Sequence, residues 1–373
     1  MLSGPLEKLI SLFEDVFEAE DSLPADVTMA ELPTDYFASL SVDQNLPLLQ
    51  IPFLRKLLKL ISLVARPSKK MRLSSNRDAH GGTPHGRGRM TDVDPDILGR
   101  ALKLLERSIK AGEDVDPFKT DRIEPRLSEV VSRKSVSPIK KSKAKKPSSN
   151  EQEQNDGDPL DSSEIGISER DLYELTRAFE LATSSILAAD CCLALLASDR
   201  LPKQFYSEEL ILTCLATIKN HLTKIVYPFM EAFTFPSLPP PLRHIVKPDL
   251  SFASTAKDHR IQLAEVFQAI SAALPRIGMM VTAEVMSMSE IIVIQAVYIA
   301  IGPFFVLEGD QDTKGKKDNV VISTLGTNAM RSLRLDALSL IRAVGVLHSV
   351  YQVIMLLIKL RYSRTTKISV PGL

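Results

Sequence analysis

The sequence contains few cysteines, and their arrangement gives no sign of a metal site. Among 373 residues, only Cys191, Cys192 and Cys214 occur, without C-x-x-C spacing, and the nearest histidine, His221, has no second ligand pair beside it. Adjacent cysteines in an apolar stretch are typical of small core residues, and a low cysteine content suits a reducing compartment. We therefore expect no metal, and no cofactor is indicated elsewhere in the chain.

Sequence motifs of common catalytic sites are also missing. No dinucleotide fingerprint, Walker A loop, H-E-x-x-H or G-x-S-x-G occurs, and the glycine-rich stretch at Gly82 lacks the lysine of a phosphate loop. The six histidines are scattered along the chain. Glu284 and Glu290 resemble a carboxylate pair, but polar-face positions of an apolar helix or a buried ion pair explain them better. The sequence predicts that the protein is not an enzyme.

No hydrophobic run is long enough to indicate a membrane segment clearly. Near the N-terminus, Glu7 and Lys8 interrupt any signal-peptide core. Residues 291–307 and 343–358 are uncharged, but 17 and 16 residues fall short of the ~20 that a span requires. Buried helices explain both stretches better, so we expect no membrane contact. A membrane-associated helical protein remains an alternative.

The part of the chain after Ser168 has the periodicity of long helices. Apolar or small residues recur every three or four positions over residues 172–196, which indicates one face of a helix. Ser168 with Asp171 predicts a capping box at its start, and residues 199–202 predict its end. Comparable repeats occur at residues 211–225, 263–277, 281–298 and 333–360.

The N-terminal part of the chain contains shorter amphipathic segments. Residues 6–17 form an acidic helix pattern and residues 51–64 a helix pattern with a basic face. Asp94 predicts an N-cap with Pro95 at the first helical position, and Gly112 lies near the expected end of that helix.

Together these patterns predict an all-α fold, a HEAT-like helical-repeat solenoid with disordered inserts. A break at residues 234–257 contains three consecutive prolines, which favour a polyproline II loop over a helix. The expected division is N-terminal helices at 1–65, a basic Gly/Ser linker at 66–93, a helical segment at 94–118, a basic-then-acidic linker at 119–167, the helical array at 168–360 and an atypical tail at 361–373.

Charge is separated along the chain although the formal net charge is zero. Residues 132–150 carry seven Lys or Arg and no acid, whereas residues 151–164 carry six acids and no base. Two clusters match the K-K-x-K/R pattern of nuclear import signals, which predicts importin as a partner: Lys69, Lys70 and Arg72, and Lys140, Lys141, Lys143, Lys145 and Lys146. The alternatives are contact with DNA phosphates without base selectivity, and a solvated linker without a partner.

Two serine or threonine sites next to proline lie in these basic stretches. Ser137 begins an S-P-x-K sequence that suits proline-directed kinases, and Thr83 precedes Pro84 as a looser second site. A phosphate at Ser137 would add a charge of about −2 beside five lysines and weaken either importin or DNA contact. We treat this switch as a hypothesis.

Several segments, in the same order, resemble the Nipped-B/adherin family, the large subunit of the cohesin-loading complex. The similar segments are LGRALKLLERSIKAGEDV at 98–115, the stretch from SILAADCC to YPFMEA at 185–232, IGPFFVLEGD at 301–310 and LRLDALSLIRAVG with its continuation at 333–358. The resemblance implies a hooked HEAT solenoid without an active site.

The resemblance also implies a function and partners. It implies a nuclear, chromatin-bound scaffold that loads cohesin for sister chromatid cohesion, with roles in the cell cycle and DNA repair. The implied partners are cohesin subunits, DNA contacted independently of sequence, and a TPR-repeat loader partner. The segment that docks into the TPR partner lies upstream of Met1 in the family, and the last 13 residues resemble nothing that should follow. We therefore expect a fragment or a truncated gene model. An unrelated nuclear HEAT or armadillo adaptor is the other alternative.

Overall fold

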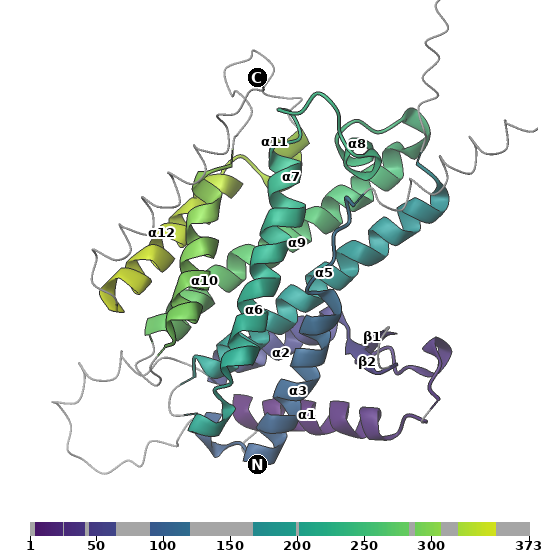
Figure 1. Cartoon of the computed structure of the whole chain (residues 1–373). Coiled ribbons are helices and arrows are strands. Elements are labelled where there is room, and N and C mark those ends of the chain that lie inside the picture. The colour runs from purple at the N-terminus through teal and green to yellow at the C-terminus, as the bar shows by residue number, and fades with distance from the viewer. Residues whose placement is uncertain are drawn as a thin grey trace, which may run out of the picture.

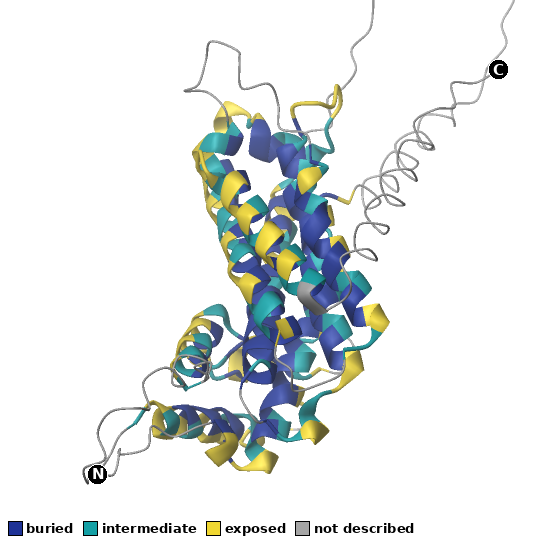
Figure 2. Cartoon of the chain, turned by 90° about the vertical axis from the view of Figure 1, so that its left-hand side faces the viewer, coloured by how far each residue is buried: buried dark blue, intermediate teal, exposed yellow. Residues whose placement is uncertain are grey.

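Long helices packed in two layers make up most of the structure (Figure 1). The computed structural model describes residues 4–24, 26–41, 45–64, 90–119, 167–198, 201–282, 288–306 and 320–347, and all structural statements concern these residues. Buried residues lie where the helices face one another, whereas the outer surfaces are exposed (Figure 2). The mainly helical fold predicted from the sequence is confirmed.

The central helix is α5, Glu169–Leu196, and its start agrees with the predicted capping box. Ser168 Oγ accepts a hydrogen bond from the Asp171 backbone N–H at 3.3 Å, and Asp171 Oδ2 accepts one from the Ser168 N–H at 3.1 Å. Every residue from Ala182 to Leu196 is buried, because other helices surround this half of α5. In the described part of the chain, α5 alone is long and apolar enough to cross a membrane, and 89% of its most apolar window is buried inside the protein.

The N-terminal elements pack on one side of α5. They are α1 (Pro5–Asp21), the antiparallel strands β1 (Phe37–Leu40) and β2 (Pro47–Leu49), α2 (Ile51–Val64) and α3 (Pro95–Gly112). Helices α2 and α3 contact α5 directly, and α1 covers α2 and α3. The predicted N-cap of α3 is confirmed, because Asp94 Oδ1 accepts a hydrogen bond from the Asp96 N–H at 2.9 Å. One apolar core therefore runs from α1 into the later helices.

The later helices continue the stack from the other side of α5. After α6 (Glu208–His221) come the π-helical turn η5 (Leu222–Val226), α7 (Tyr227–Met230), α8 (Pro240–Val246), α9 (Ala253–Thr282), α10 (Glu290–Ile301), α11 (Val320–Leu325) and α12 (Ala329–Leu347). Helix α9 lies between α5 and α12, and α10 packs between α6 and α12. Such stacking of successive helix pairs is the architecture expected for a HEAT-like array.

Two local features differ from the sequence-based expectations. The proline run does not form only a loop, because Pro239 is the N-cap of α8 and Pro240 its first residue. Proline suits this position, where the missing N–H has no helical acceptor, and α8 gains burial of Leu242 and Ile245. The hairpin of β1 and β2 was not predicted, since its strands of four and three residues are too short to show alternation.

Candidate interaction surface

The residues predicted to contact importin or DNA all lie outside the described residues. They are Lys69, Lys70, Arg72, Lys140, Lys141, Lys143, Lys145 and Lys146, and the candidate phosphorylation sites Thr83 and Ser137 lie outside as well. Their roles therefore stay predictions. Candidate sites in the described part of the chain come from other residues.

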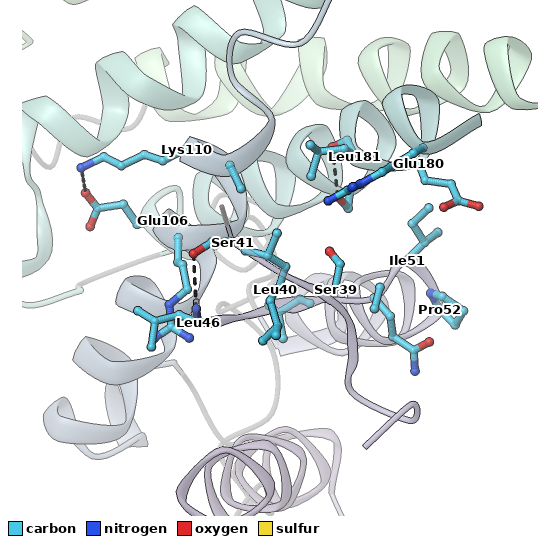
Figure 3. A pocket seen from close by; sticks show the side chains of 18 of the residues that line it. Ser39, Leu40, Ser41, Leu46, Ile51, Pro52, Glu106, Lys110, Glu180 and Leu181 are labelled. Atoms are coloured by element: carbon cyan, nitrogen blue, oxygen red, sulfur yellow. Dashed lines mark hydrogen bonds and ion pairs between the residues drawn. The ribbon is translucent and has the colours of Figure 1, made fainter. Parts of the chain in front are cut away.

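A groove lies between the β-hairpin, α3 and α5, and we call it the α3–α5 groove (Figure 3). Its volume is about 680 Å³, and its lining includes hairpin residues 38–41 and the first residues of α2. Apolar side chains line part of it, among them Leu40, Leu46 and Leu181. The groove thus joins segments that lie up to 146 positions apart in the chain, from Ala38 to Ser184.

Charged side chains stand along the α3 and α5 walls of this groove. Helix α3 supplies Lys103, Arg107 and Lys110 at spacings of four and three residues, which places them on one helix face. Lys110 Nζ lies 2.7 Å from Glu106 Oε1, and Arg107 Nη1 lies 2.7 Å from Oε1 of a glutamate on α1. Two of the three α3 cations are therefore held in ion pairs, whereas Lys103 is exposed.

On the opposite wall, α5 presents Arg177 and Glu180, both exposed. Within the described residues, neither Arg177 nor Lys103 forms an ion pair or a side-chain hydrogen bond. Four cations and two carboxylates line the groove, which gives it a formal charge of +2. Since the pattern combines two distant helices, the sequence alone did not reveal it.

The hairpin contributes two strands, which differ in what lies along their outer edges. Side chains of α3 form hydrogen bonds with backbone groups of β2. The Leu49 N–H donates to Ser108 Oγ at 3.2 Å, and Arg107 Nη1 donates to the Pro47 carbonyl at 3.2 Å. Strand β1 pairs only with β2 among the described strands. The outward N–H and C=O groups of such an edge strand can pair with another extended chain.

A charged pair is buried away from this groove, where α5, α9 and α2 meet. Asp190 is 1% exposed, and its Oδ1 lies 3.3 Å from Nε of Arg276, at a poor angle for a hydrogen bond. Arg276 Nη2 donates to Ser62 Oγ at 2.6 Å. Burial raises the pKa of Asp190 to about 6, although Arg276 lowers it in part. Because substrate cannot reach this carboxylate, its role is structural.

Histidines form two further buried polar contacts. His244 Nε2 lies 3.3 Å from His259 Nδ1, and His259 Nε2 lies 3.0 Å from Thr176 Oγ1. Burial lowers the pKa of His244 to about 4, helped by the neighbouring His259, and burial also lowers the pKa of His259. No group of three metal-ligating side chains occurs among the described residues. The two imidazoles thus stay neutral at neutral pH and link α8 to α9.

The pair of Ser185 and His221 has the distance of a catalytic dyad but not its accessibility. Ser185 Oγ lies 3.0 Å from His221 Nε2, and Oγ also donates to the Ala182 carbonyl at 2.9 Å. Both residues have 0% exposure, and burial lowers the pKa of His221 to about 4. His221 is thus a core residue.

The cysteines occupy the core, as the sequence predicted. Cys191, Cys192 and Cys214 are free thiols with 0% exposure, and burial raises the pKa of the Cys191 thiol well above its usual range. Cys191 Sγ lies 3.6 Å from the Leu54 carbonyl oxygen of α2. Thiols in this state pack as small apolar groups rather than react.

Comparison with known proteins gives a match in structure only. No protein-family model matches the chain, and no curated protein matches it in sequence. The fold is similar to a solved structure of the Chaetomium thermophilum cohesin loader SCC2, C-terminal fragment, with a TM-score of 0.55 and 16% identity. The match covers 92% of this chain but 19% of that fragment. At this identity the likeness shows the fold alone, a stack of helices similar to part of that fragment.

Proposed function

We propose that this protein is a non-enzymatic scaffold of the cohesin-loader type, which promotes loading of cohesin onto chromatin. The observation that carries the proposal is the match of 92% of the chain to a cohesin loader. The segments that resemble the Nipped-B/adherin family suggest the same function, while no family model matches the chain. Because the chain spans 19% of the matched fragment, complete loader activity is not part of the proposal.

A non-enzymatic role is part of this proposal. Asp190, His221 and Cys191, whose pKa values burial raises or lowers, lie in the core, and the α3–α5 groove holds side chains suited to binding rather than to proton transfer. A scaffold acts by presenting surfaces to partners, and cohesin subunits are the partners that we propose.

The basic tracts supply the proposed route to chromatin. Residues 69–72 and 140–146 would bind importin during entry into the nucleus and DNA phosphates afterwards. Phosphorylation of Ser137 would place negative charge beside the second tract and weaken both contacts. In this proposal the folded helices bind cohesin, and the tracts increase residence on DNA.

Affinity purification of the tagged full-length chain from nuclear extract tests the function. We expect cohesin subunits to co-purify, and to remain after nuclease treatment has removed DNA that could bridge the two. A chain that enters the nucleus but recovers no cohesin would contradict the proposal and favour an unrelated nuclear adaptor. A chain that stays in the pellet after carbonate extraction would favour the membrane alternative.

A second experiment separates the tracts from the folded helices. Alanine at Lys140, Lys141 and Lys143 should reduce nuclear accumulation of a fluorescent fusion without changing cohesin recovery from whole-cell extract. The matched control carries alanine at three exposed lysines of the folded part, Lys56, Lys59 and Lys257. Equal nuclear accumulation of both variants would contradict the import role.

A further inference from the structure

The α3–α5 groove combines two features that suit one kind of ligand. Its apolar residues, such as Leu40 and Leu181, can accept apolar side chains. Its walls carry Lys103 and Arg177, which have no ion-pair partner among the described residues. We propose that this groove binds an extended, acidic peptide segment of a partner protein.

An extended peptide can satisfy both features because its side chains alternate in direction. Successive side chains of a strand point to opposite sides, so apolar side chains can enter the groove while the acidic ones turn toward its rim. Lys103 comes from α3 and Arg177 from α5, so carboxylates of one peptide can meet cations on both walls. The formal charge of +2 favours an acidic sequence over a basic one.

The hairpin adds a backbone contact for the same ligand. Strand β1 has one partner strand among the described strands, and its residues Ser39 and Leu40 line the groove. A peptide aligned with this edge would gain main-chain hydrogen bonds, as in other cases of strand addition. Strand β2 offers no such edge, since Ser108 and Arg107 already bond to it.

Nucleic acid suits the groove less well than an acidic peptide. Glu106 and Glu180 stand beside the cations on both walls, and Glu106 already holds Lys110 at 2.7 Å. A phosphate backbone carries charge at every step and would meet both carboxylates. A peptide can place a neutral residue at those positions. The partner that supplies the acidic peptide need not belong to cohesin, so peptide binding can fail or succeed independently of the proposed function.

Fluorescence anisotropy with a labelled synthetic peptide tests the proposal on the full-length chain. The probe has about ten residues in which leucine alternates with glutamate. Two control probes replace every glutamate with lysine, or every leucine with serine. We expect saturable binding of the first probe, and affinity reduced at least about tenfold for each control. Equal affinity for the serine probe would overturn the role of the apolar lining.

Charge reversal locates the site. The double variant Lys103→Glu with Arg177→Glu should weaken probe binding on the order of tenfold. The matched control reverses two exposed cations elsewhere, Lys247→Glu with Lys257→Glu, and should change affinity less than twofold. Circular dichroism melts establish that both variants fold. Equal losses in the two variants, or displacement of the probe by duplex DNA at lower concentration than by unlabelled peptide, would overturn the proposal.

Discussion

Replacing Asp190 with asparagine should remove a loss of stability that the wild-type protein suffers as pH rises. The Asp190 side chain is 1% exposed, and its pKa rises from 3.8 to about 6 because burial penalises the charged carboxylate. A pKa difference of one unit corresponds to about 1.4 kcal/mol. Protonation of Asp190 therefore stabilises the folded chain relative to the unfolded chain by roughly 3 kcal/mol. The folded chain has this full contribution from Asp190 below pH 3.8, and the contribution is lost as pH rises through 6.

Urea unfolding of the full-length chain at several pH values between about 5 and 8 measures the effect. At each pH, the free energy of unfolding of the wild type is subtracted from that of the variant. The buried histidines make both proteins more stable as pH rises, so their contribution cancels in this difference. We expect this difference to rise by about 1–2 kcal/mol across the window, since about half of the effect falls within it. Arg276 keeps its hydrogen bond to Ser62 in the variant, which limits the cost of the substitution itself.

An exposed aspartate of the N-terminal region provides the matched control. Asp35→Asn makes the same chemical change at an exposed position, so it shows what the substitution does away from the core. A stability difference for Asp190→Asn that is constant over these pH values, or that falls with pH, would refute the reasoning. Either result would mean that the folded protein stabilises the carboxylate at least as well as water does.

Three other substitutions test packing, capping and the histidine pair. Gly112→Ala should destabilise the chain by about 1–3 kcal/mol in urea, because the added Cβ would lie 2.6 Å from Ser185 Cβ, and an unchanged midpoint would contradict this close contact. Ser168→Ala should cost about 1 kcal/mol in the same assay through loss of the capping box, and a cost near zero would contradict it. The wild-type chain should lose stability as pH falls from 6.5 toward 4, because His244 and His259 are held neutral in the folded chain and become protonated on unfolding. His244→Gln should reduce this loss, because glutamine does not take up a proton. Acid titration followed by circular dichroism checks this last prediction, which an unaltered acid midpoint would contradict.

Features set by neighbouring residues were predictable from the sequence. Ser168 and Asp171 are three positions apart, and Asp94 precedes Pro95, so each helix start depends on a few adjacent residues. The burial of Leu172, Leu175 and Phe179 also followed from their spacing of three or four residues. The prediction of a loop at the proline run missed α8, because it considered the number of prolines and not their position. Prolines disfavour the interior of a helix but are well suited to its first turn.

Features that depend on distant segments could not be predicted in this way. Gly112 was expected near a helix end for its backbone freedom, yet its effect comes from its contact with Ser185 and Leu181 on α5. Asp190 gave a signal that could have been used, since a single acid within a buried apolar run requires a partner. Its partner Arg276 lies 86 positions later, and no local pattern identifies it. The α3–α5 groove likewise exists only once the hairpin and two helices come together.

The contact between Gly112 and α5 connects the stability of the core to the proposed binding groove. The walls of the groove are α3 and α5, and Gly112 brings these helices together close to Lys110 on one wall and Leu181 on the other. A side chain at this position would push the helices apart and change the distance between Lys103 and Arg177. Gly112→Ala should therefore weaken binding of the acidic probe more than Ser168→Ala, which affects only the start of α5. If two variants of similar stability bound the probe equally well, the groove walls would have to adjust independently of the core.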